Sequence, residues 1–176
     1  LATLRSQVCI VAQDTFLFSD TIGSNISFGA GDRSNRLEYN GQYDGQRRRR
    51  GYDEQYVRRM AAIAGADGFI SSMPDGYDTV VGERGVGLSG GQKQRLSLAR
   101  ALADNPSILI MDDTTSAVDM ETEAEIQRHL RDLDEKKTIV TIAHRISSVK
   151  DSDLILVLEH GRIVERGTHD ELVASH

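Results

Sequence analysis

The stretch ILIMDDTTSAVD, from Ile108 to Asp119, runs four apolar residues directly into two adjacent aspartates. A short apolar run rich in β-branched residues is typical of a buried strand, here spanning residues 107–112. Two similar runs occur at 7–12 (QVCIVA) and 138–143 (TIVTIA). Strands that are apolar on both faces predict a sheet covered by helices on both sides.

The segment between the second and third runs predicts a helix. In METEAEIQRHLRDLDEK, residues Ile126, Leu130 and Leu133 recur at helical spacing. A strand, a helix and a strand in succession imply parallel strands. The fold class that follows is α/β, with a mostly parallel sheet and flanking helices.

The rest of the chain also contains patterns of strands, helices and loops. Two strand-like runs around His160-Gly161 predict a hairpin, and Thr168 with Glu171 three residues later predicts a capped final helix. Residues 52–73 have a helical pattern, which Pro74 and Gly76 end. The glycine-rich, aliphatic-poor segment 29–51 predicts a mobile surface insertion.

Composition narrows the classes of function. The 176 residues carry 21 Lys and Arg against 27 Asp and Glu, a net charge of −6, which argues against broad nucleic-acid binding. The basic run at 47–50 is interpreted as a solvated loop rather than a nucleic-acid or lipid patch. A single cysteine, Cys9, excludes an internal disulfide and favours a reducing compartment. No apolar stretch reaches the length of a membrane span, and without an initiating Met we expect a piece of a longer protein.

The octet LSGGQKQR, residues 88–95, predicts a helix that begins at an anion site. Ser89 is a favourable N-cap, and Gly90 and Gly91 leave the backbone N–H groups unobstructed. The helix face then continues through Leu96, Ala99 and Leu102 until Pro106. Bare N–H groups at a helix N-terminus favour a phosphate.

The octet resembles the signature motif of ATP-binding cassette (ABC) ATPases, and other motifs of that family follow in the expected order. VAQDTFLFSDTIGSNISFG resembles the Q-loop segment, GYDTVVGERG the stretch before the signature in exporter-type members, ILIMDD the Walker B strand, SAVD the D-loop and TIAHR the switch-histidine segment. The resemblance covers the chain except for the insertion.

The resemblance implies part of a RecA-like P-loop NTPase core with an inserted α-helical subdomain. Residues 1–13 would form a core strand leading to the Q-loop, 14–87 the helical subdomain, and 88–176 the signature helix and the remaining core. The implied ligands are ATP and Mg²⁺. The implied partners are a second nucleotide-binding domain and the coupling helices of a transmembrane domain, at the cytoplasmic face of the cell membrane.

Individual roles also follow from the resemblance. Asp112 would hold Mg²⁺, mostly through water, and Gln13 would sense that ion and signal to the membrane domain. His144 would contact the γ-phosphate. The remaining assignments are Ser89, Gly90, Gly91 and Gln92 to the partner's ATP, and Asp119 to the partner subunit and to a helix N-cap.

Asp113 departs from the family pattern, because members usually carry the catalytic glutamate there. Adjacent side chains on an extended strand point to opposite sides, so Asp112 and Asp113 should have different jobs. Aspartate withdraws the carboxylate by roughly 1 Å, and an error of that size can cost a base about a hundredfold in rate. The chain also contains no G-x-x-x-x-G-K-[ST] loop, so alone it is expected to be inactive.

These features predict the ATP-hydrolysing module of an exporter, with a degenerate site of its own and a signature that serves a heterodimeric partner. Three alternatives stay open. One is a homodimer with Asp113 as a slow base, and another is a non-catalytic fragment that binds an intact ABC subunit. The third, an ABC ATPase acting on DNA or ribosomes, is disfavoured by the acidic charge.

Overall fold

The computed structural model describes residues 7–29, 52–82, 85–133 and 137–175. The predicted insertion at 29–51, apart from Gly29, and the basic run at 47–50 therefore lie outside the described residues.

A three-stranded parallel sheet forms the centre of the molecule. Its strands are β1 (Val8–Val11), β2 (Ile108–Asp112) and β3 (Thr138–Ile142), in the order β1-β2-β3. Ile108 pairs with Val8 on one side and with Thr138 on the other. The three predicted strands and their parallel direction are confirmed.

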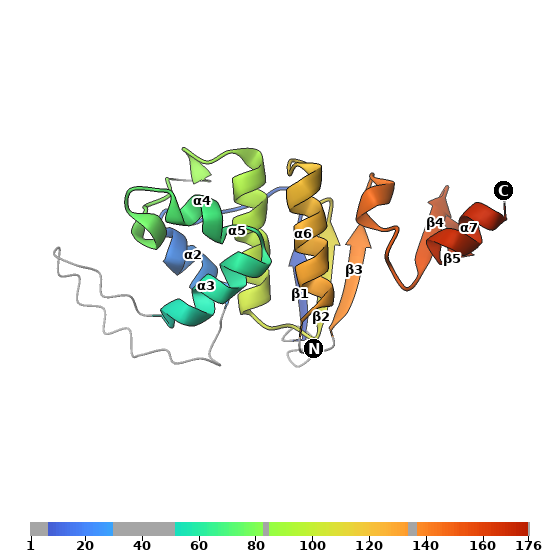
Figure 1. The fold of residues 1–176 in the computed structure, drawn as a ribbon, viewed down its shortest axis with the longest axis horizontal. Coiled ribbons are helices and arrows are strands. Elements are labelled where there is room, and N and C mark those ends of the chain that lie inside the picture. The colour runs from blue at the N-terminus through green and yellow to red at the C-terminus, as the bar shows by residue number, and fades with distance from the viewer. Residues whose placement is uncertain (1–6, 30–51, 83–84, 134–136, 176) are drawn as a thin grey trace.

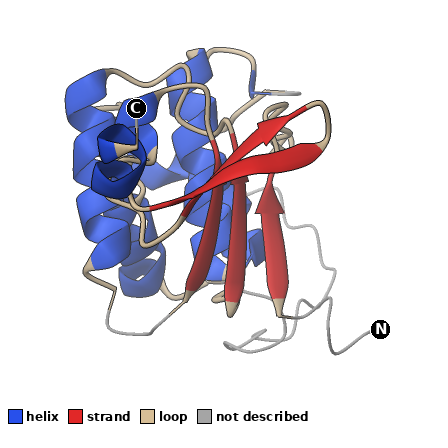
Figure 2. Cartoon of the chain, turned by 90° about the vertical axis from the view of Figure 1, so that its right-hand side faces the viewer, coloured by secondary structure: helices blue, strands red, loops and turns tan. Residues whose placement is uncertain are grey.

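Two helices run beside this sheet, α5 (Gly90–Ala103) and α6 (Met120–Arg131). They cover the face on which Leu109 and Met111 are buried, whereas on the opposite face Ile10 is 62% and Val140 44% exposed. Figure 2 shows the described helices on one side of the three strands. The prediction of helices on both sides is therefore wrong for the described part of the chain, since alternating side chains meet helices on one face only.

Three short helices pack around the long α5 (Figure 1): α2 (Ile22–Ser27), α3 (Glu54–Ile63) and α4 (Asp67–Ser71), followed by the 3₁₀ turn η2 (Gly76–Asp78). Leu96, Leu98 and Leu102 of α5 are buried in the shared core. α5 packs on α2 and α3, which lie in the predicted helical subdomain, and also reaches β1, which lies in the predicted core.

The helical pattern over residues 52–73 forms two helices rather than one. Gly65 lies between α3 and α4 with a φ of 64°, a conformation that costs a residue with a Cβ about 1–2 kcal/mol. A Cβ there would also lie 3.3 Å from Ile126 and Thr122 of α6. The break therefore lets the helical part approach α6 closely.

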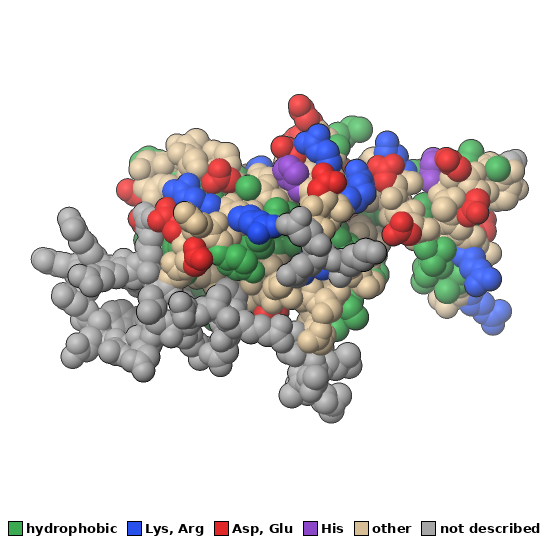
Figure 3. Space-filling model, turned by 60° about the horizontal axis from the view of Figure 1, so that its bottom comes forward, with side chains coloured by type: hydrophobic (Ala, Val, Ile, Leu, Met, Phe, Trp, Pro, Cys, Tyr) green, Lys and Arg blue, Asp and Glu red, His purple; other side chains and the backbone are tan. Residues whose placement is uncertain are grey.

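The C-terminal part is an antiparallel hairpin, β4 (Ile155–Glu159) and β5 (Arg162–Gly167), followed by α7 (His169–Ala174). The predicted hairpin and the Thr168–Glu171 capping box are both confirmed. Figure 3 shows hydrophobic side chains gathered over this hairpin, where Leu158 is 65% and Ile163 58% exposed. Within the described ranges, no helix has both the length and the apolar character needed to cross a bilayer.

Candidate functional site

The carboxyl edge of the parallel sheet gathers the predicted polar residues. Asp112 ends β2, Gln13 lies two residues beyond β1, and His144 lies two residues beyond β3. Gln13 and His144 are exposed, and Asp112 is half-buried. The N-termini of α5 and α6 lie at the same end of the sheet (Figure 1). This is the edge at which open α/β sheets bind their ligands.

Asp113 leaves the strand instead of extending it. Its φ is 51°, and its backbone N–H donates to the Ile142 carbonyl at 2.9 Å. The expectation that strand alternation separates the two aspartates is therefore wrong, because β2 ends at Asp112 and the chain turns at Asp113. Aspartate tolerates this left-handed conformation better than most residues. A tight turn, not a pleat, sets the direction of the second carboxyl group.

The turn that follows Asp113 is closed by its own residues. Ser116 donates to the Asp113 carbonyl from its backbone N–H at 3.3 Å and from its hydroxyl at 2.9 Å. Val118 N–H donates to the Thr115 carbonyl at 3.0 Å. Residues 113–118, here called the aspartate turn, thus connect the end of β2 to the start of α6.

The donors at this edge fit magnesium bound together with a phosphate ligand. No group of three or more His, Cys, Asp or Glu side chains gathers in a metal-binding arrangement within the described part of the chain. Magnesium is usually held by one or two carboxylates, water and substrate phosphates rather than by an all-protein cage. Asp112, with Asp113 beside it, matches such a partial donor set.

The N-terminus of α5 has the predicted capping geometry. Ser89 Oγ accepts a hydrogen bond from Gln92 N–H at 3.3 Å, and Gln92 Oε1 accepts one from Ser89 N–H at 2.9 Å. This reciprocal box uses the side chains of Ser89 and Gln92, while the first N–H groups of a helix have no intrahelical partner. Ser89 and Gly90 are exposed, so the end of α5 suits an anion such as phosphate.

Packing against the protein also favours glycine at position 91. A Cβ at this position would lie 2.6 Å from the carbonyl oxygen of Ala117, whereas one at Gly90 would meet only the Ala117 Cβ at 3.5 Å. The first turn of α5 is therefore in direct backbone contact with the aspartate turn. The sequence suggested an open glycine pair for a ligand, but Gly91 is buried against the protein itself.

Gln94 extends this contact with hydrogen bonds. Its side-chain oxygen accepts from Ala117 N–H at 3.1 Å, and its amide nitrogen donates to Ser116 Oγ at 3.1 Å and to the Asp113 carbonyl at 3.4 Å. Gln94 is only 6% exposed. Gln94 belongs to the octet LSGGQKQR, but this role was not predicted. The signal for it is a polar residue one turn after Gly91 on the same helix face.

Asp119 forms the predicted N-cap of α6, and its carboxylate accepts from Thr122 N–H at 2.9 Å. The hydrogen bonds from Thr122 lower the pKa of Asp119, with a smaller contribution from the positive charge of Arg95. The side chain is exposed. A carboxylate beside the N-terminus of a helix is further stabilised by the helix dipole.

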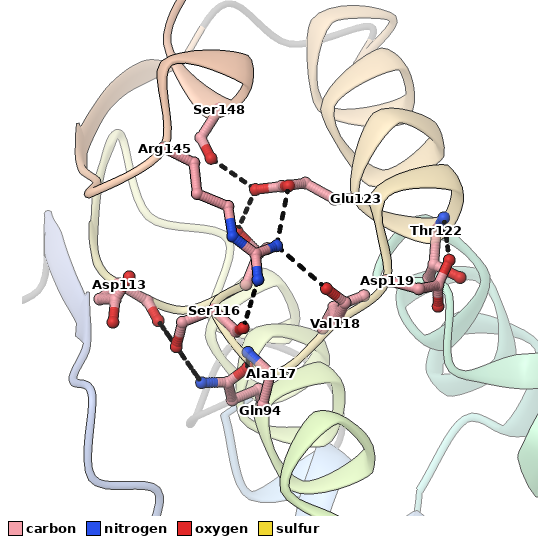
Figure 4. A network of polar contacts seen from close by, with 11 residues as sticks. Gln94, Asp113, Ser116, Ala117, Val118, Asp119, Thr122, Glu123, Arg145 and Ser148 are labelled. Atoms are coloured by element: carbon pink, nitrogen blue, oxygen red, sulfur yellow. Dashed lines mark hydrogen bonds and ion pairs between the residues drawn. The ribbon is translucent and has the colours of Figure 1, made fainter.

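A second group of contacts holds the aspartate turn from its other side (Figure 4). Arg145 donates to the Ser116 carbonyl at 2.8 Å and to the Val118 carbonyl at 3.2 Å. The same guanidinium lies 3.5 Å from Glu123, whose side chain is 3% exposed. Arg145 follows His144 directly, so the residues after β3 are tied to the turn after β2.

Glu123 is the buried member of this group. It accepts from Thr115 Oγ1 at 2.7 Å and from Ser148 Oγ at 2.5 Å, besides its contact with Arg145. A buried carboxylate is expensive unless it is paired and hydrogen-bonded, and Glu123 is both. The role of Glu123 was not predicted, although its spacing with Ile126 and Leu130 places it on the buried face of α6.

Arg100 connects α5 to the residues that follow Gln13. It donates to the Phe16 carbonyl at 2.8 Å, and to both the carbonyl and the side-chain oxygen of the buried Asn25 at 2.9 Å each. Its guanidinium also lies 5.1 Å from the ring centroid of Phe18. Burial lowers the pKa of Arg100. The sequence patterns did not predict this role of Arg100.

Comparison with known proteins gives a consistent family. The family model described as ABC transporter matches residues 1–116. The uncharacterized ABC transporter ATP-binding protein YknU of Bacillus subtilis is 51% identical over 173 residues, which span 98% of this chain and 26% of that protein. An ATP-dependent lipid A-core flippase of Photobacterium profundum is 44% identical over 173 residues, again 98% of this chain and 26% of the relative.

A solved structure, that of a bacterial Atm1-family ABC exporter with ATP bound, superposes with a TM-score of 0.82 at 42% identity. It matches 99% of this chain and 27% of the exporter chain. The chain thus spans about a quarter of the length of these relatives. The expected α/β class and the family resemblance are both confirmed, and the chain belongs to the ABC transporter family.

Proposed function

We propose that this chain is the later part of the nucleotide-binding domain of an exporter, which binds and hydrolyses ATP to move a substrate across the membrane. The observation that carries the proposal is the shared edge, where Gln13, Asp112, Asp113 and His144 lie at the carboxyl ends of three adjacent parallel strands. The exporter relatives support it by their similarity over nearly the whole chain.

In this proposal each residue at the edge has a limited task. Asp112 would hold Mg²⁺, mostly through water, and Gln13 would sense that ion. His144 donates a hydrogen bond to the terminal phosphate. Magnesium, when bound, supplies charge neutralisation on the phosphate oxygens.

Asp113 is the residue that would orient the attacking water. Its carboxylate is one methylene shorter than that of the usual glutamate, and its left-handed backbone is fixed by the aspartate turn. We infer that this carboxylate reaches its water poorly and that the chain's own site is degenerate. The signature residues 89–92 would then complete the site of a different, competent partner domain.

The exposed aromatic residues near Gln13 support docking of a transmembrane domain. Phe16 is 55% exposed, Phe18 37% and Phe28 67%. Their rings contact one another, with centroids 5.2 Å apart for the first pair and 4.6 Å for Phe18 and Phe28. Such a cluster suits the apolar face of a short coupling helix, which would place this domain at the cytoplasmic face of the membrane.

The decisive experiment compares Mg-ATP hydrolysis by the full-length protein, without any partner subunit, for the native sequence and Asp113→Glu. We expect slow native hydrolysis that rises by about tenfold to a hundredfold with glutamate, because the reach of the acid limits the site. Asp113→Asn is the matched control, since asparagine tolerates the same backbone conformation and cannot act as a base. It should abolish the residual rate.

The alternatives give different results. Brisk native hydrolysis that is little changed by glutamate would refute the degenerate site and favour a homodimer with Asp113 as base. Absence of hydrolysis in every full-length variant, with or without a partner, would favour a non-catalytic subunit. We further expect no hydrolysis by the 176 residues alone, because they lack a G-x-x-x-x-G-K-[ST] loop.

A further inference from the structure

The aspartate turn, residues 113–118, is held by side chains that come from outside it. Its polar backbone groups include the carbonyls of Asp113, Ser116 and Val118 and the N–H of Ala117. Gln94 of α5 forms hydrogen bonds with the Asp113 carbonyl and the Ala117 N–H, and Arg145 forms them with the carbonyls of Ser116 and Val118. Two elements far apart in the sequence therefore fix the backbone of one short turn.

The contact on the α5 side leaves little freedom. Gln94 is almost fully buried and uses both atoms of its amide on the turn. One helical turn earlier, Gly91 lies so close to Ala117 that a Cβ would approach the carbonyl oxygen to 2.6 Å. The signature end of α5 and the aspartate turn consequently have to move together.

The contact on the other side is held by a buried carboxylate. Glu123 receives hydrogen bonds from Thr115 and Ser148 and orients Arg145 at 3.5 Å. The planar guanidinium reaches two carbonyls of the turn at once, which a lysine ammonium cannot match in geometry. The segment beginning at His144 is thereby joined to the same turn.

We propose that Gln94 and Arg145 are positioning residues that hold the aspartate turn between them, so that Asp113, His144 and the signature end of α5 act as one rigid unit. The inference rests on the proposed function for its catalytic part. The rigidity of the turn does not depend on the proposed function. Displacing Asp113 by a fraction of an ångström would reduce the rate of hydrolysis without weakening the binding of ATP.

The test uses the full-length protein without a partner subunit, so that the site of Asp113 carries the measured hydrolysis of Mg-ATP. The variants are Gln94→Met, Arg145→Lys and Arg145→Met. Amide hydrogen exchange of residues 113–118, measured without nucleotide, reports on the turn itself. Gln94→Met removes the acceptor of the Ala117 N–H, and loss of that one hydrogen bond should accelerate exchange at Ala117 about fivefold to tenfold. Gln127→Met is the matched control, because this half-buried glutamine of α6 has a side-chain nitrogen without a partner among the described residues.

The second readout is steady-state hydrolysis. We expect kcat to fall at least about tenfold in Gln94→Met while the KM for ATP stays within about twofold of the native value. The fall in kcat should be smaller for Arg145→Lys than for Arg145→Met. Partial rescue by lysine and an unchanged KM separate positioning from simple loss of folding. If Gln94→Met fails to fold, the two Arg145 variants decide the question by the same measurements.

The outcomes are separable. Unchanged exchange at residues 113–118 in all three variants would refute the rigid turn, even in an active protein. Faster exchange with an unchanged kcat would refute its catalytic role. Absence of hydrolysis by the native full-length protein would refute the proposed function and the catalytic role together, whereas the exchange result would still decide whether the turn is rigid.

Discussion

Substituting alanine for Gly91 tests the contact between α5 and the aspartate turn most directly. The new Cβ would lie 2.6 Å from the Ala117 carbonyl oxygen and 3.3 Å from its carbonyl carbon. Both are backbone atoms, so relief requires the helix or the turn to shift. Overpacking of this kind costs about 1–3 kcal/mol, and a contact this short belongs in the upper part of that range.

The helix itself gains from the same substitution. Alanine is favoured over glycine by up to about 1 kcal/mol within a helix, and by less near its first turn. The net effect is a destabilisation of about 1–2 kcal/mol. For a protein of this size that corresponds to a fall in Tm of roughly 2–8 °C.

The assay is thermal unfolding of the 176-residue chain, with Gly90→Ala as the matched control. A Cβ at Gly90 would meet only the Ala117 Cβ at 3.5 Å, an ordinary contact. We expect this control to stay within about 2 °C of the native Tm, because propensity alone changes. Equal Tm values for the two alanine variants would refute the close approach of the helix and the turn.

Two further predictions concern the hydrogen bonds of Arg100 and the helix cap Asp119. Arg100→Met removes the hydrogen bonds to Phe16 and to the buried Asn25, which should lower the free energy of unfolding by about 3 kcal/mol and Tm by roughly 6–12 °C. Arg100→Lys should lower Tm by less. A methionine variant as stable as the native chain would refute the prediction. Asp119 has a folded-state pKa below its usual range because of Thr122, so its contribution to stability is present above the ordinary aspartate pKa of about 3.9 and is lost as pH falls through the folded value. Unfolding measured from pH 6 to pH 2 should show this loss in the native chain and not in Asp119→Asn, which keeps a capping side chain without a titrating group; identical pH profiles would refute the prediction.

Local sequence rules predicted the framework of the fold. The three apolar runs, the hairpin turn at His160-Gly161 and the capping residues Ser89 and Thr168 each depend on neighbours within a few positions, and all occur where expected. The helix break at Gly65 was missed, since it depends on packing against α6 rather than on the local helical pattern.

The candidate site was predictable only in outline. The position of Asp112, Gln13 and His144 at one edge follows from parallel strands. The left-handed turn at Asp113 does not, because it is held by Gln94, 19 residues earlier, and by contacts of Arg145, 29 residues beyond Ser116. Such long-range hydrogen bonds leave no periodic signal in the sequence.

The way in which the aspartate turn is held has a consequence for how substitutions distribute. Gln94 and Arg145 contact Ala117 and Val118 through the main chain alone, and the Ala117 residue is exposed. A library of variants should therefore accept many side chains at position 117 and few at positions 94 and 145. The geometry of this turn depends more on the side chains that surround it than on its own side chains.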